Sequence, residues 1–159
     1  MSRSERALLT IACMVYRDDQ ILLQKVDKGN WWRGLFFPGG HVEPNESFVQ
    51  AVIREIKEET GLTIRNPQLC GIKQFQADND ERYVVLLYKT NEFAGALTSS
   101  DEGEMVWVSR EDLPQLAVAP TFFEVLRIMD EAQLSELYYE RETLGAAWHE
   151  QNKWITRFY

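Results

Sequence analysis

The sequence predicts an α/β (α+β) fold in which a mixed β-sheet is sandwiched between helices. Strand-like runs and two helix-like segments follow one another along the 159 residues, an order that gives a sheet with helices packed against it. Hydrophobic residues make up 45% of the chain and aromatic residues 12%, which is enough apolar surface for a single core. We expect a main domain at residues 1–132. An aromatic-rich extension at 133–159 would pack on the same domain or at a dimer interface.

Two β-rich runs open the chain, at 7–16 and 20–26. The polar residues between them, around Asp18 and Asp19, predict a hairpin. Later strand-like runs lie near 62–65, 69–76, 82–90 and 104–109. The segment 78–81 is rich in turn-forming residues, so the second and third of these runs are predicted to form another hairpin.

From about residue 45 the spacing of apolar residues becomes helical, and this helix is predicted to end near Thr60. Asn45 or Ser47 can cap its start, and Gly61 lies where a left-handed residue often ends a helix. One side of the helix is apolar and is expected to pack on the sheet: Phe48, Val49, Ala51, Val52, Ile53 and Ile56. A second helix is predicted at 121–132.

Three carboxylates lie at the edge of this apolar side. Glu55 and Glu59 are separated by about 40° around the helix, and Glu58 is one step further. Burying like charges together is unfavourable, and a divalent cation with oxygen ligands would relieve the repulsion. The alternative is a solvated helix face with ordinary ion pairs, such as Arg54 to Glu58. The segment 38–40, Pro-Gly-Gly, favours a site, because glycines permit unusual backbone conformations and let a phosphate or metal approach a carbonyl.

The formal net charge of −8 restricts the partners of this protein. A negative surface repels nucleic-acid polymers and anionic membranes, so we expect neither as a partner. A small anionic substrate stays compatible if metal ions or a few basic side chains bridge the like charges. Cys13 and Cys70 each lie in an apolar run and are expected to be reduced thiols of a cytoplasmic protein.

A fixed frame of residues spans Gly40 to Leu62. It consists of Gly40, Glu46, Arg54, Glu55, Ile56, Glu58, Glu59, Gly61 and Leu62. These positions match G-x(5)-E-x(7)-R-E-U-x-E-E-x-G-U, where U is a bulky aliphatic residue, so the chain resembles the Nudix hydrolase superfamily. The stretch 36–43 is similar to the MutT-like branch, the 8-oxo-dGTP diphosphatase type. The resemblance covers about 5–130 and implies the Nudix fold.

The resemblance also implies roles for the matching residues. Glu55 and Glu59 would be the principal metal ligands, and Glu58 would be a further ligand or a partner through water. The Gly40 carbonyl would lie near the metal, and Arg54 would orient the carboxylates. The implied cofactor is Mg²⁺, for which Mn²⁺ can substitute; it would clamp phosphate oxygens and activate water.

Further glutamates are implied outside this set. Glu46 would anchor the loop and helix or join the outer metal shell. A glutamate beyond the motif often joins the metal cluster or serves as the base, and Glu102 and Glu104 are the candidates. We prefer Glu104, because its spacing to the strand containing Trp107 fits better. The alternative for both is a solvated loop residue.

The expected substrate is a nucleoside triphosphate, with 8-oxo-dGTP the best guess, because markers of the ADP-ribose, NADH and coenzyme A branches are absent. Four aromatic residues are candidates for stacking on the base: Trp31, Trp32, Phe75 and Tyr83. Core and loop packing is their alternative role. In one departure, the chain has Ala-Val-Ala-Pro at 117–120, where MutT-type enzymes can carry an Asn that reads the oxidised base.

Two other functions stay open at this point. The chain could act on another nucleoside diphosphate derivative or a pterin triphosphate, or it could be a Nudix-fold nucleotide sensor without turnover. The extension, which includes Trp148 and Trp154, could cap the active site, mediate a homodimer or complete the core.

Overall fold

The computed structural model describes residues 3–29, 31–141 and 154–159. Its main feature is a nine-stranded sheet in which β11-β10-β6-β7-β1-β2-β3 lie in this order, while β4 pairs with β1 and β9 with β2. The strands are β1 (Ala7–Arg17), β2 (Gln20–Asp27), β3 (Arg33–Phe36), β4 (Gly39–His41), β6 (Gln68–Gln76), β7 (Arg82–Thr90), β9 (Met105–Ser109), β10 (Glu136–Arg141) and β11 (Trp154–Phe158). The β1–β7 and β6–β10 pairs are parallel and the others antiparallel, so the predicted mixed sheet is confirmed.

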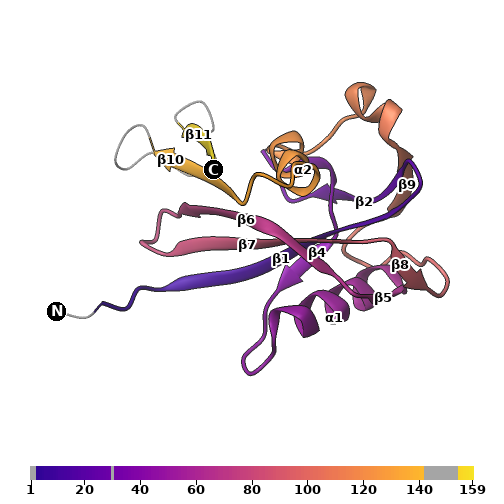
Figure 1. The fold of residues 1–159 in the computed structure, drawn as a ribbon, viewed down its shortest axis with the longest axis horizontal. Coiled ribbons are helices and arrows are strands. Elements are labelled where there is room, and N and C mark those ends of the chain that lie inside the picture. The colour runs from indigo at the N-terminus through magenta and orange to yellow at the C-terminus, as the bar shows by residue number, and fades with distance from the viewer. Residues whose placement is uncertain (1–2, 30, 142–153) are drawn as a thin grey trace.

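Helices α1 (Phe48–Thr60) and α2 (Phe122–Asp130) cover opposite faces of this sheet. In Figure 1, strands β1, β6 and β7 run between α2 above and α1 below. The alternation of side chains along β1 explains the two layers. Ala12 and Met14 belong to the hydrophobic cluster that contains α2, whereas Ile11 and Cys13 belong to the cluster that contains α1. The expectation of a sheet sandwiched between helices is therefore confirmed.

The sequence signals at both ends of α1 form as expected. The Ser47 hydroxyl accepts a hydrogen bond from the Gln50 amide at 3.0 Å, and the Gln50 side chain accepts one from the Ser47 amide at 2.8 Å. This capping box satisfies amides that the first helical turn leaves unpaired. Gly61 ends the helix with a φ of 78°, which an L side chain adopts only with strain.

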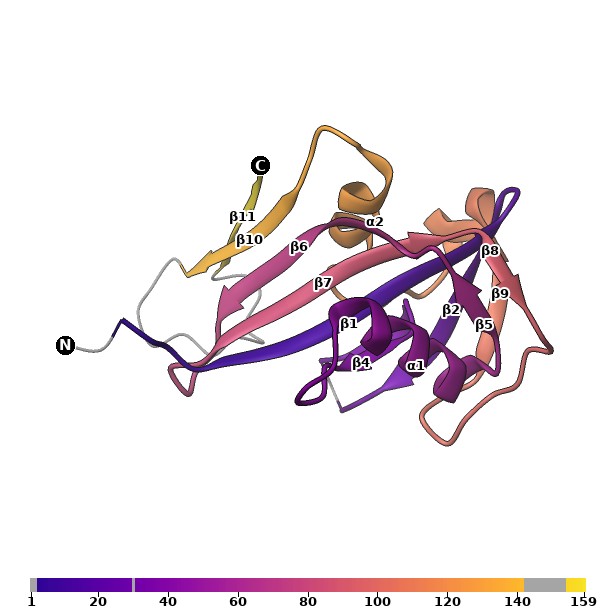
Figure 2. The same cartoon turned by 60° about the horizontal axis from the view of Figure 1, so that its bottom comes forward.

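The apolar side of α1 is shorter than predicted. Ala51, Val52 and Ile56 are fully buried, but Phe48 is 40% and Val49 44% exposed. The prediction that these two pack on the sheet is wrong, because the helix is buried only from Ala51 onward. Figure 2 shows α1 lying in front of β1 and β4, two of the strands that it contacts.

The described part of the C-terminal extension adds two strands to the sheet. Strand β10 pairs in parallel with β6, and β11 pairs antiparallel with β10. Leu137 is fully buried and Tyr139 is 8% exposed, so both complete the core on the α2 side. Residues 142–153, which include Trp148, lie outside the described residues. The division of the chain at residue 132 stays a prediction.

Smaller elements complete the fold. A two-stranded sheet pairs β5 (Thr63–Arg65) with β8 (Glu92–Ala94), of which β8 was not predicted, and a 3-10 helix, η1, spans Arg110–Gln115. Cys13 and Cys70 are free thiols, as expected. In the described ranges, no helix combines the length and the apolar character needed to cross a bilayer.

Candidate active site

The C-terminal turn of α1 carries a buried carboxylate. Glu59 is only 4% exposed, and its Oε2 accepts a hydrogen bond from the Gly39 amide at 3.0 Å. Burial raises the pKa of Glu59 well above its ordinary value. A hydrogen bond to the Glu102 carboxyl and the charge of Glu102 raise it further, and the charge of Glu55 adds to the effect. Glu59 and the exposed Glu102 bring carboxylate oxygens together, and such oxygens are the ligands that a divalent cation takes.

Glu102 is held beside Glu59 by a tightly packed loop. Its amide donates to the Ser100 hydroxyl at 3.2 Å, and the Gly103 amide donates to the Ser100 carbonyl at 3.2 Å. Gly103 has a φ of 153°, and a Cβ there would lie 2.4 Å from the Lys25 carbonyl oxygen. Only glycine permits this approach, so the loop has little freedom to move Glu102 away.

The two glycines of the Pro-Gly-Gly segment are required for close packing. A Cβ on Gly39 would lie 2.0 Å from the Ile11 carbonyl oxygen, and a Cβ on Gly40 would lie 2.3 Å from Glu55 Oε2. Neither glycine has a positive φ, so the expected unusual backbone conformation is wrong. Gly40 leaves a space that the Glu55 carboxylate fills. The contact of its carbonyl with a metal stays a prediction.

Arg54 connects four glutamates next to this pair. Its guanidinium donates to Glu46 at 2.7 and 2.8 Å, to Glu55 at 2.8 Å and to Glu58 at 3.2 Å. It also donates to the His41 carbonyl at 2.9 Å and lies 3.9 Å from Glu43. The hydrogen bonds from Arg54 lower the pKa of Glu46 to about 2, with help from a backbone hydrogen bond. This arrangement is what the expected orienting role of Arg54 requires.

The three expected metal ligands therefore differ in their surroundings. Glu59 is buried beside Glu102, Glu55 is half-buried between Gly40 and Arg54, and the Glu58 side chain is 59% exposed. The ion pair between Arg54 and Glu58, which the solvated-helix alternative predicts, is present. Across the residues that the structure describes, no three carboxylate, histidine or cysteine side chains converge into a complete ligand set. The donors fit a divalent cation in kind, and Glu59 with Glu102 is the pair that fits in position.

Glu104 is separated from this group. It forms an ion pair with Lys25 at 2.9 Å, and its side chain is 59% exposed. The preference for Glu104 over Glu102 is not supported by its position. Glu102 and Glu104 both precede β9 and are separated by Gly103. Their distance from the strand along the sequence does not determine which side chain points toward α1.

A partly open pocket with a volume of about 110 Å³ forms the second part of the site. It is lined by Trp31, Trp32, Lys73, Phe75, Thr121, Glu124, Tyr139, Trp154 and Thr156. Three of the four residues expected to stack on a base are among them. The fourth, Tyr83, stacks on Phe75 with ring centroids 5.2 Å apart and so supports the wall from the neighbouring strand.

Lys73 is the unexpected residue of this pocket. It is 7% exposed, and its Nζ donates to the Thr121 hydroxyl at 2.9 Å. The ammonium lies 5.6 to 5.9 Å from the centroids of four rings, Trp32, Phe36, Phe75 and Tyr139. Burial lowers the pKa of Lys73 to about 8, and the charge of Glu124 opposes this shift. The one signal in the sequence was a lysine at an inward position of a strand, two residues before Phe75.

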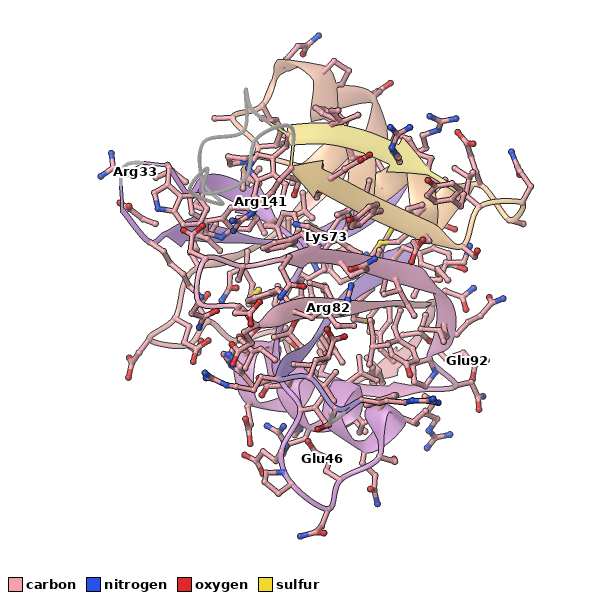
Figure 3. All side chains as sticks on the ribbon, turned by 90° about the vertical axis from the view of Figure 1, so that its left-hand side faces the viewer. Arg33, Glu46, Lys73, Arg82, Glu92 and Arg141 are labelled. Atoms are coloured by element: carbon pink, nitrogen blue, oxygen red, sulfur yellow. The ribbon has the colours of Figure 1, made fainter. Side chains whose placement is uncertain are left out.

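The segment from Trp32 to Gly40 links the two parts. Trp32 lines the pocket and contacts Phe36 at 5.0 Å between ring centroids, while Gly39 donates to Glu59. Figure 3 shows Lys73 between β6 and β10 in the upper half of the view and Glu46 in the lower part beside α1. The site thus combines an acidic cluster on α1 with an aromatic pocket on the α2 side of the sheet.

The buried Glu59 beside Glu102, next to an acidic helix linked by Arg54, offers oxygen ligands of the kind that divalent cations prefer. The family model for the NUDIX domain matches residues 7–127. The chain belongs to the Nudix family, whose members hydrolyse pyrophosphate bonds and generally use divalent metals.

Similar proteins place it near the MutT-like branch. It is 32% identical to the Uncharacterized Nudix hydrolase YvcI of Bacillus subtilis, over 76% of this chain and 78% of that protein. It is 31% identical to the CTP pyrophosphohydrolase of Escherichia coli, over 73% of this chain and 86% of that protein. The crystal structure of the mutator MutT protein from Bacillus halodurans superposes with a TM-score of 0.73 at 25% identity, covering 95% of this chain and 97% of that one.

Proposed function

We propose that this protein is a Mg²⁺-dependent pyrophosphohydrolase that cleaves a nucleoside triphosphate into a nucleoside monophosphate and pyrophosphate, with Mn²⁺ able to replace Mg²⁺. Its substrate of choice is 8-oxo-dGTP or a related purine triphosphate. The observation that carries the proposal is the pairing of the buried Glu59 carboxyl with the exposed Glu102 carboxyl, beside Glu55. The net charge of −8 supports a small cytoplasmic nucleotide rather than a nucleic-acid polymer as the partner.

Three carboxylates of this chain would bind the metal. Glu59 and Glu102 would hold it, and Glu55 would join them from its position against Gly40. When bound, Mg²⁺ neutralises charge on phosphate oxygens and lowers the pKa of water near them. Arg54 fixes Glu46, Glu55 and Glu58 through charge-assisted hydrogen bonds. Glu58, half exposed beside Arg54, would act at the rim of the site as a further ligand or as a partner through water.

The aromatic pocket supports a nucleotide as the substrate. Trp31, Trp32 and Phe75 present ring faces and edges that suit a flat base, and stacking contributes about 1–3 kcal/mol per base. A triphosphate attached to a base in this pocket would extend along the segment that ends at Gly39 and Gly40.

Glutamine substitutions test the proposal. Glu59→Gln keeps the size of the side chain but cannot supply an anionic oxygen to a metal, and we expect turnover to fall at least about a hundredfold. Glu102→Gln should also reduce turnover, whereas Glu104→Gln, in the exposed ion pair with Lys25, should leave it nearly unchanged. Pyrophosphate release from dGTP, 8-oxo-dGTP, dCTP and ADP-ribose is measured with Mg²⁺, and Mn²⁺ binding is measured separately by electron paramagnetic resonance.

The outcomes separate enzyme from sensor. The proposal is supported if the wild type releases pyrophosphate and if Glu59→Gln and Glu102→Gln show both reduced turnover and weakened Mn²⁺ binding. Tight nucleotide binding without release of pyrophosphate or phosphate from any substrate would instead indicate a nucleotide sensor. Unchanged turnover and Mn²⁺ affinity in Glu59→Gln would refute the ligand assignment.

A further inference from the structure

The aromatic pocket contains two opposite charges that do not neutralise each other. Lys73 projects from β6, and Glu124 comes from the first turn of α2. No ion pair joins them, so their charged atoms are more than 4.0 Å apart. They are nevertheless close enough to interact, since the charge of Glu124 raises the pKa of Lys73 against the effect of burial. Both residues line the same pocket, so each can contact a ligand bound there.

The hydrogen-bonding capacity of Lys73 is largely unused. A protonated amine carries three N–H donors. Within residues 3–29, 31–141 and 154–159, the Thr121 hydroxyl is the one oxygen that accepts from it. The other contacts of the ammonium are with aromatic rings, which attract a cation but accept hydrogen bonds weakly. Lys73 therefore presents donors for an acceptor atom of a ligand.

Glu124 offers the complementary group. Its side chain lines the pocket, and it forms neither a hydrogen bond nor an ion pair with any described residue. A carboxylate has two oxygens that can accept two parallel N–H bonds. A ligand that uses both charges must carry an acceptor next to a pair of N–H donors. The aromatic walls require it to be flat.

The edge of a guanine base meets these requirements. It presents the O6 carbonyl, then N1–H, then the 2-amino group, so an acceptor lies beside two adjacent donors. Adenine and cytosine each present one amino group beside acceptor nitrogens, which leaves one carboxylate oxygen without a partner. An unpaired buried polar group is unfavourable, so the pocket discriminates against these bases.

We propose that Lys73 and Glu124 read a guanine base in this pocket, Lys73 donating to O6 and Glu124 accepting from N1–H and the 2-amino group. The proposal rests on the proposed function, since it names the base of the nucleotide that the acidic site would cleave. 8-Oxoguanine has the same edge, so these two residues recognise guanine whether or not its C8 is oxidised.

A comparison of dGTP with dITP tests the contact of Glu124, because dITP lacks only the 2-amino group. In the wild type, KM for dITP should be about tenfold higher than for dGTP, with a similar kcat. In Glu124→Gln this ratio should fall toward one. Lys73→Met should raise KM for both nucleotides, because both carry O6. Glu111→Gln on η1 and Lys89→Met on β7 are the matched controls and should keep the wild-type ratio.

Binding without metal gives a second measurement. Quenching of tryptophan fluorescence by dGMP and dIMP should show the same preference and the same loss in Glu124→Gln, whether or not the phosphate chemistry proceeds. Circular dichroism verifies that each variant is folded.

Three results distinguish this proposal from the proposed function. Equal KM values for dGTP and dITP in the wild type, unchanged discrimination in Glu124→Gln, or a preference for dCTP or dATP would overturn the guanine assignment. In each of these cases, pyrophosphate release would still support the hydrolase. Preferential dGMP binding without turnover of any nucleotide would support the guanine assignment and reject the hydrolase.

Discussion

Replacing Lys73 with methionine is expected to stabilise the protein at neutral pH. The pKa of Lys73 is lowered from 10.5 to about 8 because the ammonium is buried among aromatic rings. A shift of this size corresponds to about 3 kcal/mol of unfavourable burial of the charged form. The loss of the hydrogen bond to Thr121 offsets about 1 kcal/mol of the gain, so Lys73→Met should be more stable by about 1–2 kcal/mol at pH 7.

The pH dependence of this difference is the stronger test. Below pH 8 Lys73 is protonated in both the folded and the unfolded chain, and the folded state bears the full penalty. Between pH 8 and 10.5 the unfolded chain binds more protons at this position, so the stability of the wild type rises with pH relative to the variant. The wild type should recover about 2 kcal/mol of the difference between pH 7 and pH 9.5.

Urea unfolding at pH 7 and pH 9.5, followed by tryptophan fluorescence, measures this change. Other groups that titrate in the same range are common to both proteins and cancel in the difference. Lys89→Met, which removes a lysine from the neighbouring strand, is the control. A stability difference between Lys73→Met and the wild type that stays constant with pH would show that the ammonium is not buried as described.

Two further predictions concern α1 and its surroundings. Gly40→Ala places a methyl group 2.3 Å from Glu55 Oε2 and should therefore displace this carboxylate. We expect kcat to fall by up to about a hundredfold while the fold is retained. An unchanged kcat in the variant would contradict the packing of Gly40 against Glu55. Ser47→Ala removes the capping box and should reduce the free energy of unfolding by about 1 kcal/mol in urea titrations. Ser47→Asn, which keeps a capping oxygen, should restore most of it, and equal stability of all three proteins would argue against the cap.

The acidic half of the site was accessible to sequence analysis because its residues are close together in the chain. The spacing of Glu55, Glu58 and Glu59 on one helix depends only on the helical period, and so do the capping signals at Ser47 and Gly61. The same local rules predicted the strands on both sides of the turns. These rules overestimated the buried length of α1, because the spacing of apolar residues does not show how far the sheet extends beneath the helix.

The aromatic pocket depended on contacts between distant parts of the chain. Lys73 and Glu124 line the same pocket because α2 packs over β6, and Tyr139 joins them because β10 pairs with β6 in parallel. A shift of one residue in the strand register exchanges the inward and the outward side chains. The sequence around Lys73 therefore did not show that its side chain is buried. The choice between Glu102 and Glu104 was of the same kind.

The local sequence is therefore sufficient for the family, the helix and its acidic face, since each follows from residues within a few turns of one another. The base pocket, its opposite charges and the place of the C-terminal strands come from tertiary packing. They arise when the free energy of burying apolar surface brings together segments whose separation along the chain carries no periodic signal.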